Sequence, residues 1–281
     1  MKILKSMLLI ATAMMVVVSC ESKKDSPTNK IQKILVLYYS QTSNTKTVAQ
    51  EIATRLHADI EEITMVNPYN GDFQNTIERC IQEREQGIIP EIQPVVSDIA
   101  NYDVIFIGYP IWFGTYAPPI AAFLDKVDLS GKKIVPFCTF GSGGLESSVK
   151  NLIEQQPHAE VLSGYGIRAA RLDEAPNEID QFLKANGFLE GEYVQLADFP
   201  EQHPVNKDEA DIFDSAVGNY PMIHATAKTV AVRTIPEGME YLFTAIDLPR
   251  ENDPKLPPTG EMQVYVTVAN GKAPVFTKVI R

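Results

Sequence analysis

Residues 33–56 read KILVLYYSQTSNTKTVAQEIATRL, an apolar run followed by a polar loop and an amphipathic segment. The β-branched and aromatic run predicts a strand over residues 33–39. Val48, Ile52 and Leu56 recur at four-residue spacing, which predicts a helix with one apolar face. Because a strand, a loop and a helix in this order begin a βαβ unit, the stretch indicates an α/β fold.

The same alternation of strand and helix patterns continues to residue 188. We expect further strands at 59–64, 104–108, 133–137 and 160–166, and helices at 75–85, 117–126, 144–155 and 174–184. The strands that begin near Val104 and Ile134 are apolar without alternation, as in a parallel sheet that helices cover on both faces. Right-handed crossovers between such units predict a doubly wound parallel sheet.

Length and composition predict a globular chain of two domains. The 281 residues exceed the span of about 100–200 residues that one domain usually takes. With 44% hydrophobic residues the chain can build a sizeable core. We expect an α/β domain over 33–188 and a β-rich C-terminal module over 189–281. The net charge of −11 and the lack of a basic patch argue against nucleic-acid binding.

The first twenty residues resemble an export signal. Lys2 and Lys5 precede an uncharged apolar run, Met7 to Val18, whose length falls short of the roughly 20 residues of a membrane-spanning helix. The run ends in Val-Val-Ser-Cys20, which resembles a bacterial lipobox and predicts lipidation of Cys20. The alternatives are an ordinary signal peptide, or an N-terminal anchor helix, with a chance cysteine.

Residues 21–32 are polar and would form a flexible tether between the lipid and the folded domain. This organisation predicts an exported protein that is lipid-anchored in the bacterial cell envelope, on the periplasmic face or the cell surface. Contact with the membrane would be made through the N-terminal lipid alone.

The remaining cysteines and the histidines indicate neither a disulfide nor a metal site. Cys80 lies in an expected helix and Cys138 in an expected strand, so both are interpreted as buried thiols. No CxxC motif occurs, and the four histidines are scattered singly at positions 57, 158, 203 and 224.

Three segments of unusual composition follow successive inner strands of the expected sheet, at the edge where open α/β proteins bind ligands. The first segment consists of Ser40, Gln41, Thr42, Ser43, Asn44 and Thr45. It offers hydroxyls, amides and a helix N-terminus without an acidic side chain, a combination that suits a phosphate group. The alternative is a helix N-cap that happens to be rich in Ser and Thr.

The second segment is aromatic and is bracketed by glycines. Its candidate ligand-binding residues are Tyr109, Pro110, Ile111, Trp112, Phe113 and Gly114. Such rings are costly to leave in water unless they cover a flat group, and a planar tricyclic ring would suit them. The alternative is that this expected loop packs against the second domain or against itself.

The third segment is Thr139-Phe140-Gly141-Ser142-Gly143-Gly144. Its candidate ligand-binding residues are Phe140, Gly141, Ser142, Gly143 and Gly144. Glycines in such a loop allow backbone N–H groups to approach a ligand closely. The alternative is that the glycines only serve the turn from strand to helix.

The runs ILVLYYSQTSNTKTVAQEIA (34–53) and GYPIWFGTYAPPIAAFLDKVDLSGKKIVPFCTFGSGGLESSVKNL (108–152) together resemble the flavodoxin family. The resemblance extends over about 34–188. It implies the strand order 2-1-3-4-5, FMN as cofactor, its phosphate on residues 40–45 and its ring between 109–114 and 140–144. Ser43 stands where the family has glycine, and a positive φ there would strain the backbone.

The sequence and the resemblance are compatible with two main functions. The first is an FMN oxidoreductase of the envelope that passes electrons from NAD(P)H or a protein donor to a quinone or another small acceptor. The second is a non-enzymatic electron carrier that docks with redox partner proteins. A flavin-binding scaffold without turnover is a third reading. No Ser-His-Asp or paired-carboxylate arrangement demands acid–base catalysis.

The charge of the chain leads to an expectation about the flavin. Residues 40–45 include neither Lys nor Arg, and the chain carries −11. Like-charge repulsion is therefore expected to lower the reduction potential of a bound flavin.

The C-terminal module shows no family resemblance. A short helix is expected at 208–217, followed by strands at 229–235, 240–247, 262–268 and 274–280. Met262, Val264 and Val266 share one strand face, and Asn270-Gly271 predicts a two-residue hairpin. The module is thus expected to be a small antiparallel sheet whose role the sequence leaves open.

Overall fold

The computed structural model describes residues 32–281 except 71, 219 and 249–259. Within that part of the chain, 32–281 cluster into one compact unit. The predicted signal peptide, the predicted lipidation site Cys20, the tether up to residue 31 and residues 249–259 lie outside the described residues. None of the described helices is long and apolar enough to cross a bilayer.

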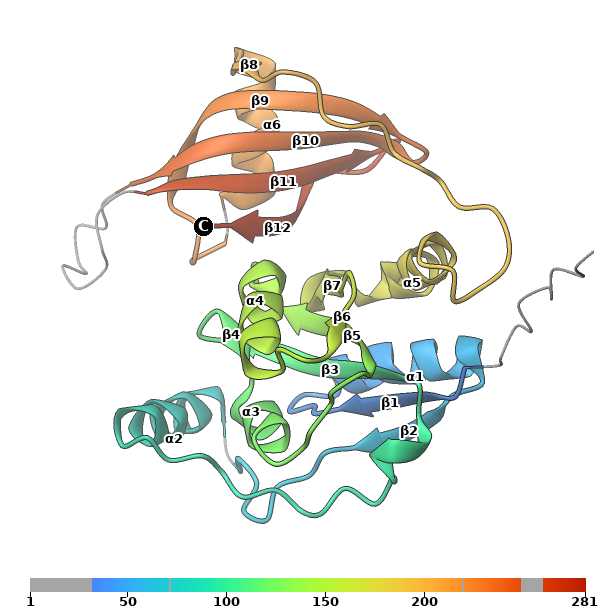
Figure 1. Cartoon of the computed structure of the whole chain (residues 1–281). Coiled ribbons are helices and arrows are strands. Elements are labelled where there is room, and N and C mark those ends of the chain that lie inside the picture. Colours follow the sequence, from blue (N-terminus) through green and yellow to red (C-terminus); the bar gives the residue numbers. More distant parts are fainter. Residues whose placement is uncertain (1–31, 71, 219, 249–259) are drawn as a thin grey trace, which may run out of the picture. The chain divides into compact units, whose positions relative to one another are not determined.

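The first half of the unit is a parallel sheet with the order β2-β1-β3-β5-β6 (Figure 1), which confirms the predicted doubly wound topology. Its strands are β1 (Ile34–Tyr38), β2 (Asp59–Glu62), β3 (Val104–Trp112), β5 (Lys133–Phe140), β6 (Glu160–Val161) and β7 (Tyr165–Arg168). β6 and β7 both pair in parallel with β5. The single last strand expected at 160–166 is therefore split into two short pieces.

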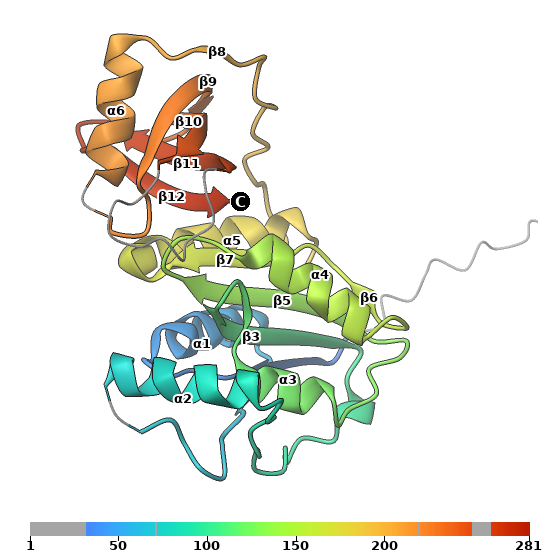
Figure 2. The same cartoon turned by 90° about the vertical axis from the view of Figure 1, so that its left-hand side faces the viewer.

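Helices cover both faces of this sheet (Figure 2). They are α1 (Asn44–Leu56), α2 (Phe73–Glu85), α3 (Pro118–Leu124), α4 (Leu145–Gln155) and α5 (Ala175–Ala185), with 3-10 turns at Ile99–Asn101 and Ala169–Glu174. Ile52 of α1 and Leu183 of α5 are buried against one face. Ile120 of α3 and Leu152 of α4 are buried against the other. Two packed faces explain why the central strands are apolar throughout.

The aromatic segment differs from the loop that its sequence predicts. β3 continues to Trp112 and forms a tight hairpin with β4 (Thr115–Tyr116). The two turn residues have positive φ, 50° at Phe113 and 80° at Gly114, as the favoured two-residue hairpin turns require. The expectation of a loop over residues 109–112 is wrong, because cross-strand pairing with β4 extends the strand.

The C-terminal module is an antiparallel sheet of order β12-β11-β10-β9-β8, as the alternation predicts (Figure 1). Its elements are β8 (His203–Pro204), α6 (Lys207–Val217), β9 (Ala225–Ile235), β10 (Gly238–Asp247), β11 (Glu261–Ala269) and β12 (Val275–Ile280). Phe213 and Val217 of α6 share a core with the predicted inner face of β11, which includes Val264. This packing gives the module its own hydrophobic core.

The expected two-residue hairpin at Asn270-Gly271 is wrong in length. β11 ends at Ala269 and β12 begins at Val275, so five residues connect the strands. Within this connection Gly271 has φ 73° while Asn270 does not have a positive φ. The type I′ turn needs positive φ at both central residues, and a longer loop forms instead.

Candidate functional site

The three segments singled out in the sequence follow β1, β3 and β5. Because these strands are adjacent and parallel, their carboxyl ends meet at one edge of the sheet. The side chains of Thr45, at the start of α1, and Thr139, at the end of β5, share a buried hydrogen bond of 2.8 Å between their hydroxyl oxygens. The first and third segments are thus in direct contact, as their predicted role requires.

The first segment has the properties of an anion site at a helix N-terminus. The opening turn of α1 contains no acidic residue, and the Ser43 side chain makes no capping hydrogen bond. Helix geometry leaves the N–H groups of this turn without intrahelical acceptors, and the helix dipole favours an anion there. One of these N–H groups, that of Lys46, donates a hydrogen bond to Ser40 Oγ at 3.2 Å. The remaining N–H groups of this turn are suited to bind a phosphate.

The side chains of this segment divide between exposure and internal bonding. Thr42 and Ser43 are exposed, Ser40, Gln41 and Asn44 are half-buried, and Thr45 is buried. The Gln41 amide donates to the Tyr69 carbonyl oxygen at 2.7 Å, and the Tyr39 hydroxyl donates to Gln41 Oε1 at 2.5 Å. Gln41 therefore holds the loop in place, while the exposed hydroxyls are available to an anion.

Ser43 adopts the conformation that the sequence flags as strained. Its φ is 64° with ψ −5°, in the left-handed region. This conformation costs a residue with a Cβ about 1–2 kcal/mol of conformational energy, whereas glycine adopts it without that cost. The serine hydroxyl is exposed and makes no cap, so nothing within the segment offsets this cost.

Replacing Ser43 with glycine is expected to raise the stability of the protein. The relief of strain outweighs the added chain entropy by about 0.5–1 kcal/mol, which appears as a higher midpoint of thermal unfolding. Thr47→Gly in the same helix, at a residue without positive φ, serves as the control and should lower stability by about 0.3–0.5 kcal/mol, the difference in helix propensity between Thr and Gly. Equal destabilisation by both substitutions would contradict the strain at residue 43.

The second segment presents Trp112 beside the first. Its ring lies edge-on to the rings of Tyr39 and Tyr69, at centroid distances of 6.2 and 5.2 Å. Since Tyr69 also receives the Gln41 hydrogen bond, a chain of contacts connects the polar loop to the half-buried indole. Burial raises the pKa of both phenols well above their usual range. They stay neutral hydrogen-bond donors.

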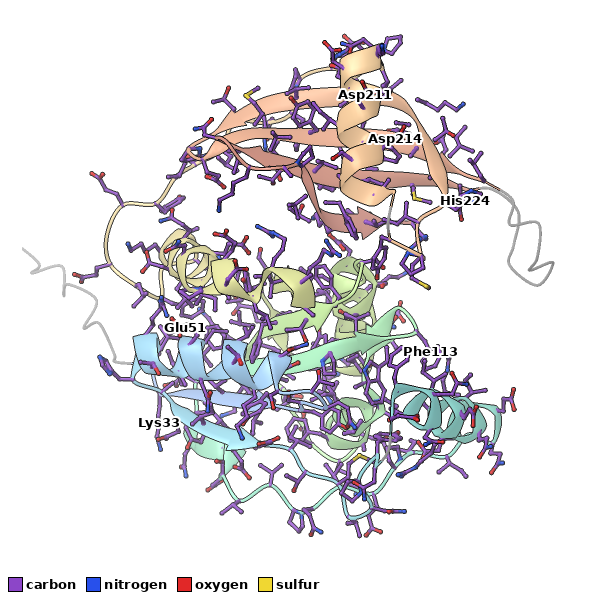
Figure 3. All side chains as sticks on the ribbon, turned by 180° about the vertical axis from the view of Figure 1, so that it is seen from behind. Lys33, Glu51, Phe113, Asp211, Asp214 and His224 are labelled. Atoms are coloured by element: carbon purple, nitrogen blue, oxygen red, sulfur yellow. The ribbon has the colours of Figure 1, made fainter. Side chains whose placement is uncertain are left out.

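The other members of this segment divide into buried and exposed residues. Tyr109 is fully buried, and its hydroxyl pairs with Ser148 Oγ at 3.2 Å, so it offers no exposed face for stacking. Phe113 is 48% exposed at the hairpin tip, with the Arg84 guanidinium 4.7 Å from its ring centroid (Figure 3). Pro110 and Ile111 are half-buried, and Gly114 is exposed. A flat ligand would meet Trp112 and Phe113 rather than Tyr109.

The third segment is joined to the second. Ser147 of α4 donates to the Gly114 carbonyl oxygen, and the Asn151 amide donates to Thr115 Oγ1 at 2.8 Å. Gly144 has φ 114°, and a Cβ on it would lie 2.6 Å from Ile111 Cγ2. Only glycine fits this position. Phe140 is buried, Ser142 and Gly143 are half-buried, and Gly141 is exposed.

The sequence analysis missed Arg168 at the carboxyl end of β7. Its side chain is buried, and its Nε donates to the carbonyl oxygen of Gly141 in the third segment at 2.9 Å. Burial lowers the pKa of this guanidinium, which nevertheless keeps its charge as arginines do in proteins. The signal in the sequence was a charged residue that ends an apolar strand at the ligand-binding edge.

Other chemistry is not supported at this edge. Burial raises the pKa of the Cys138 thiol, next to Thr139, well above its ordinary value. Cys80 and Cys138 are both free and buried, which confirms the expected thiols. Across the described residues, no group of His, Cys, Asp and Glu side chains could hold a metal ion.

The fold and the converging segments define an open α/β protein whose candidate site combines an uncapped helix N-terminus with an aromatic hairpin at one edge of the sheet. The sequence profile of the flavodoxin family matches residues 33–181. This match covers more than half of the chain, and the protein therefore belongs to the flavodoxin family.

Individual relatives match parts of the chain. An NAD(P)H dehydrogenase (quinone) of Cupriavidus metallidurans is 28% identical over 139 residues, which cover 46% of this chain and 67% of that protein. An uncharacterised protein of Methanocaldococcus jannaschii is 33% identical over 116 residues, 41% of this chain and 59% of its own length. A flavoprotein of Lactobacillus acidophilus, solved in complex with FMN, has 27% identity and a TM-score of 0.45 over 48% of this chain and 93% of its own.

Proposed function

We propose that the chain binds FMN at the three strand-end segments and acts as an oxidoreductase of the cell envelope that passes electrons to a quinone or another small acceptor. The observation that carries the proposal is the convergence of all three segments. The Thr45–Thr139 hydrogen bond joins the first to the third, and the Gln41–Tyr69–Trp112 contacts join the first to the second.

The residues at this edge fit the cofactor. The uncapped N-terminus of α1, with exposed Thr42 and Ser43 beside it, suits the phosphate. Trp112 and Phe113 would cover the isoalloxazine, and residues 140–144 would lie along its other side. The second and third segments contact each other closely, since a Cβ at position 144 would clash with Ile111.

FMN would supply the hydride and electron chemistry of the reaction. The protein supplies binding and orientation: the helix terminus holds the anion, and the aromatic hairpin excludes water from one side of the ring. Gln41 accepts a hydrogen bond from the Tyr39 phenol and donates to the backbone carbonyl of Tyr69. Because the rings of both tyrosines contact Trp112, these bonds keep the hairpin and the polar loop in fixed relation. The electron donor and acceptor would approach the part of the flavin ring that these segments leave uncovered.

The names of relatives favour a reductase. The Cupriavidus metallidurans relative is named an NAD(P)H dehydrogenase (quinone). We expect FMN-loaded protein to lose its visible flavin absorbance when NADH or NADPH is added, and to regain it with a soluble quinone. Stopped-flow absorbance with each nicotinamide measures both steps.

The alternative is an electron carrier that docks with redox proteins, which the acidic charge of −11 favours through attraction to basic partners. A carrier would be reduced by dithionite but by neither nicotinamide. That result would contradict a nicotinamide-dependent enzyme and would support the electron carrier.

The envelope location is also part of the proposal. It is supported by the apolar run that ends in Val-Val-Ser-Cys20. Fractionation of cells tests it: the protein is expected with the membranes, and recovery in the soluble fraction alone would contradict lipid anchoring.

A further inference from the structure

The third segment contacts the C-terminal module through its backbone. β12 is an edge strand of the antiparallel sheet. The N–H of Val279 in β12 donates to the carbonyl oxygen of Ser142 at 2.7 Å. An edge strand otherwise presents such groups to solvent. Here one of them holds a residue of the predicted flavin site.

Two glycines of the third segment are explained by this contact. A Cβ on Gly143 would lie 2.0 Å from the carbonyl oxygen of Val279, and a Cβ on Gly141 would lie 2.7 Å from the Tyr220 hydroxyl. The clash at Gly143 is with backbone, which cannot move away as a flexible side chain can. These glycines therefore allow the module, and not only a ligand, to come close.

Arg168 joins the same two parts through one guanidinium. Besides the bond from its Nε to Gly141, its Nη1 donates to the carbonyl oxygen of Phe276 in β12 at 2.8 Å. The guanidinium also stacks on the Phe276 ring, 3.4 Å from its centroid. The side chain is 8% exposed. The planar guanidinium of Arg168 thus donates hydrogen bonds to the third segment on one side and to the C-terminal module on the other.

An ion pair adds to this junction at its exposed rim. Lys278 of β12 lies 3.0 Å from Glu146, in the first turn of α4. Both side chains are about a third or more exposed, so the pair contributes little beyond orientation.

We propose that the C-terminal module positions the third flavin segment, with Arg168 as the positioning residue that ties residues 141–143 to β12. This inference rests on the proposed binding of FMN and gives the module a role that its sequence left open. In this arrangement the segment is held in place before the ligand arrives, which reduces the entropy lost on binding.

Arg168 also affects the reduction potential that is expected for a bound flavin. The sequence placed no cation at the flavin, whereas the structure places a buried guanidinium on a carbonyl of the third segment. A nearby positive charge stabilises added negative charge. Arg168 would therefore raise the potential of the flavin relative to a neutral side chain.

The test uses full-length Arg168→Gln and Arg168→Lys with FMN. Both substitutions remove the bridge between Gly141 and Phe276, and only the second keeps the charge. Both are expected to weaken FMN binding by about tenfold, the typical effect of losing hydrogen bonds made by a charged group. The potential should fall in Arg168→Gln and stay near wild type in Arg168→Lys.

Arg233→Gln is the matched control. Arg233 also donates to a backbone carbonyl, that of Ala197 at 2.8 Å, and covers an aromatic ring, that of Phe199, at 4.1 Å. The partners of its hydrogen bonds, ion pair and ring contact, which are Ala197, Glu240 and Phe199, all lie outside the third segment. Arg233→Gln should therefore lower stability without changing FMN affinity. Unchanged affinity in both Arg168 variants, or an equal loss in Arg233→Gln, would overturn the proposal.

Hydrogen exchange in protein without FMN separates this inference from the cofactor assignment. Gly143→Ala should force the third segment and β12 apart and speed amide exchange at residues 140–144 and 275–280. Gly260→Ala, where a Cβ meets nothing within 4 Å, should not. Slow exchange retained in Gly143→Ala would refute the positioning role even if FMN binds. Fast exchange at residues 140–144 in the wild type would also refute the positioning role. Slow exchange in a wild type that binds no FMN would refute only the proposed function.

Discussion

Thr42→Asp is expected to lower the affinity for FMN by about a hundredfold. Thr42 is exposed just before α1, where the phosphate is proposed to lie. A carboxylate about 5 Å from a phosphate charge, at an effective dielectric constant near 20, costs about 3 kcal/mol, and each 1.4 kcal/mol corresponds to about tenfold in affinity. Fluorescence titration of FMN measures the loss, which should shrink at high salt.

The effect of Thr42→Asp on folding has the opposite sign. An acidic residue near a helix N-terminus stabilises the helix by about 0.3–1 kcal/mol. The unfolding midpoint should therefore stay the same or rise while binding is lost. Gln50→Glu introduces the same charge on an exposed position of α1, about 9 Å further along its axis, and should leave affinity nearly unchanged. Wild-type affinity in Thr42→Asp would place the phosphate elsewhere.

Trp112→Ala is expected to weaken FMN binding by about thirtyfold. Loss of a stacked aromatic ring costs about 2 kcal/mol in comparable base–aromatic contacts. The substitution also removes the edge contacts with Tyr39 and Tyr69, so stability should fall as well. Titration of FMN and thermal unfolding measure the two effects separately.

Phe188→Ala separates the loss of packing from the loss of stacking. Phe188 is also a half-buried aromatic residue with an edge-on partner, Phe106, at 5.1 Å, and it belongs to the core on the α1 and α5 face. Phe188→Ala should lower the stability of the protein without changing its affinity for FMN. If both variants bound FMN equally well, the ring would not lie on Trp112.

The sequence predicts well what local spacing determines. The apolar spacing of Val48 and Ile52 correctly gives α1, and the unbroken apolar run from Val104 correctly gives a buried central strand. The order of the sheet followed from the family resemblance. The polar residues 40–45 were recognisable because six polar side chains after a buried strand exceed the needs of a helix cap.

Features that depend on tertiary contacts were not predictable in the same way. The sequence alone could not show that Tyr109 faces the core, because its environment is set by Ser148, thirty-nine residues away. The hairpin after Trp112 needed β4, which is only two residues long. Arg168 gained its role from Phe276, 108 residues further along the chain.

Ser43 lies between these two cases. Its departure from the family's glycine was visible in the sequence, and so was the question of its φ. The answer, 64°, required the structure. For Gly141 and Gly143, the sequence suggested contact with a ligand. The structure adds a second reason for glycine, because a Cβ at these positions would clash with Tyr220 and Val279.

FMN bound at the three strand-end segments would be detected by titration of full-length protein into FMN, with flavin fluorescence and visible absorbance recorded together. We expect stoichiometric quenching and a yellow protein that keeps its colour through gel filtration. A colourless protein that leaves the fluorescence of an equimolar amount of FMN unquenched would contradict FMN binding.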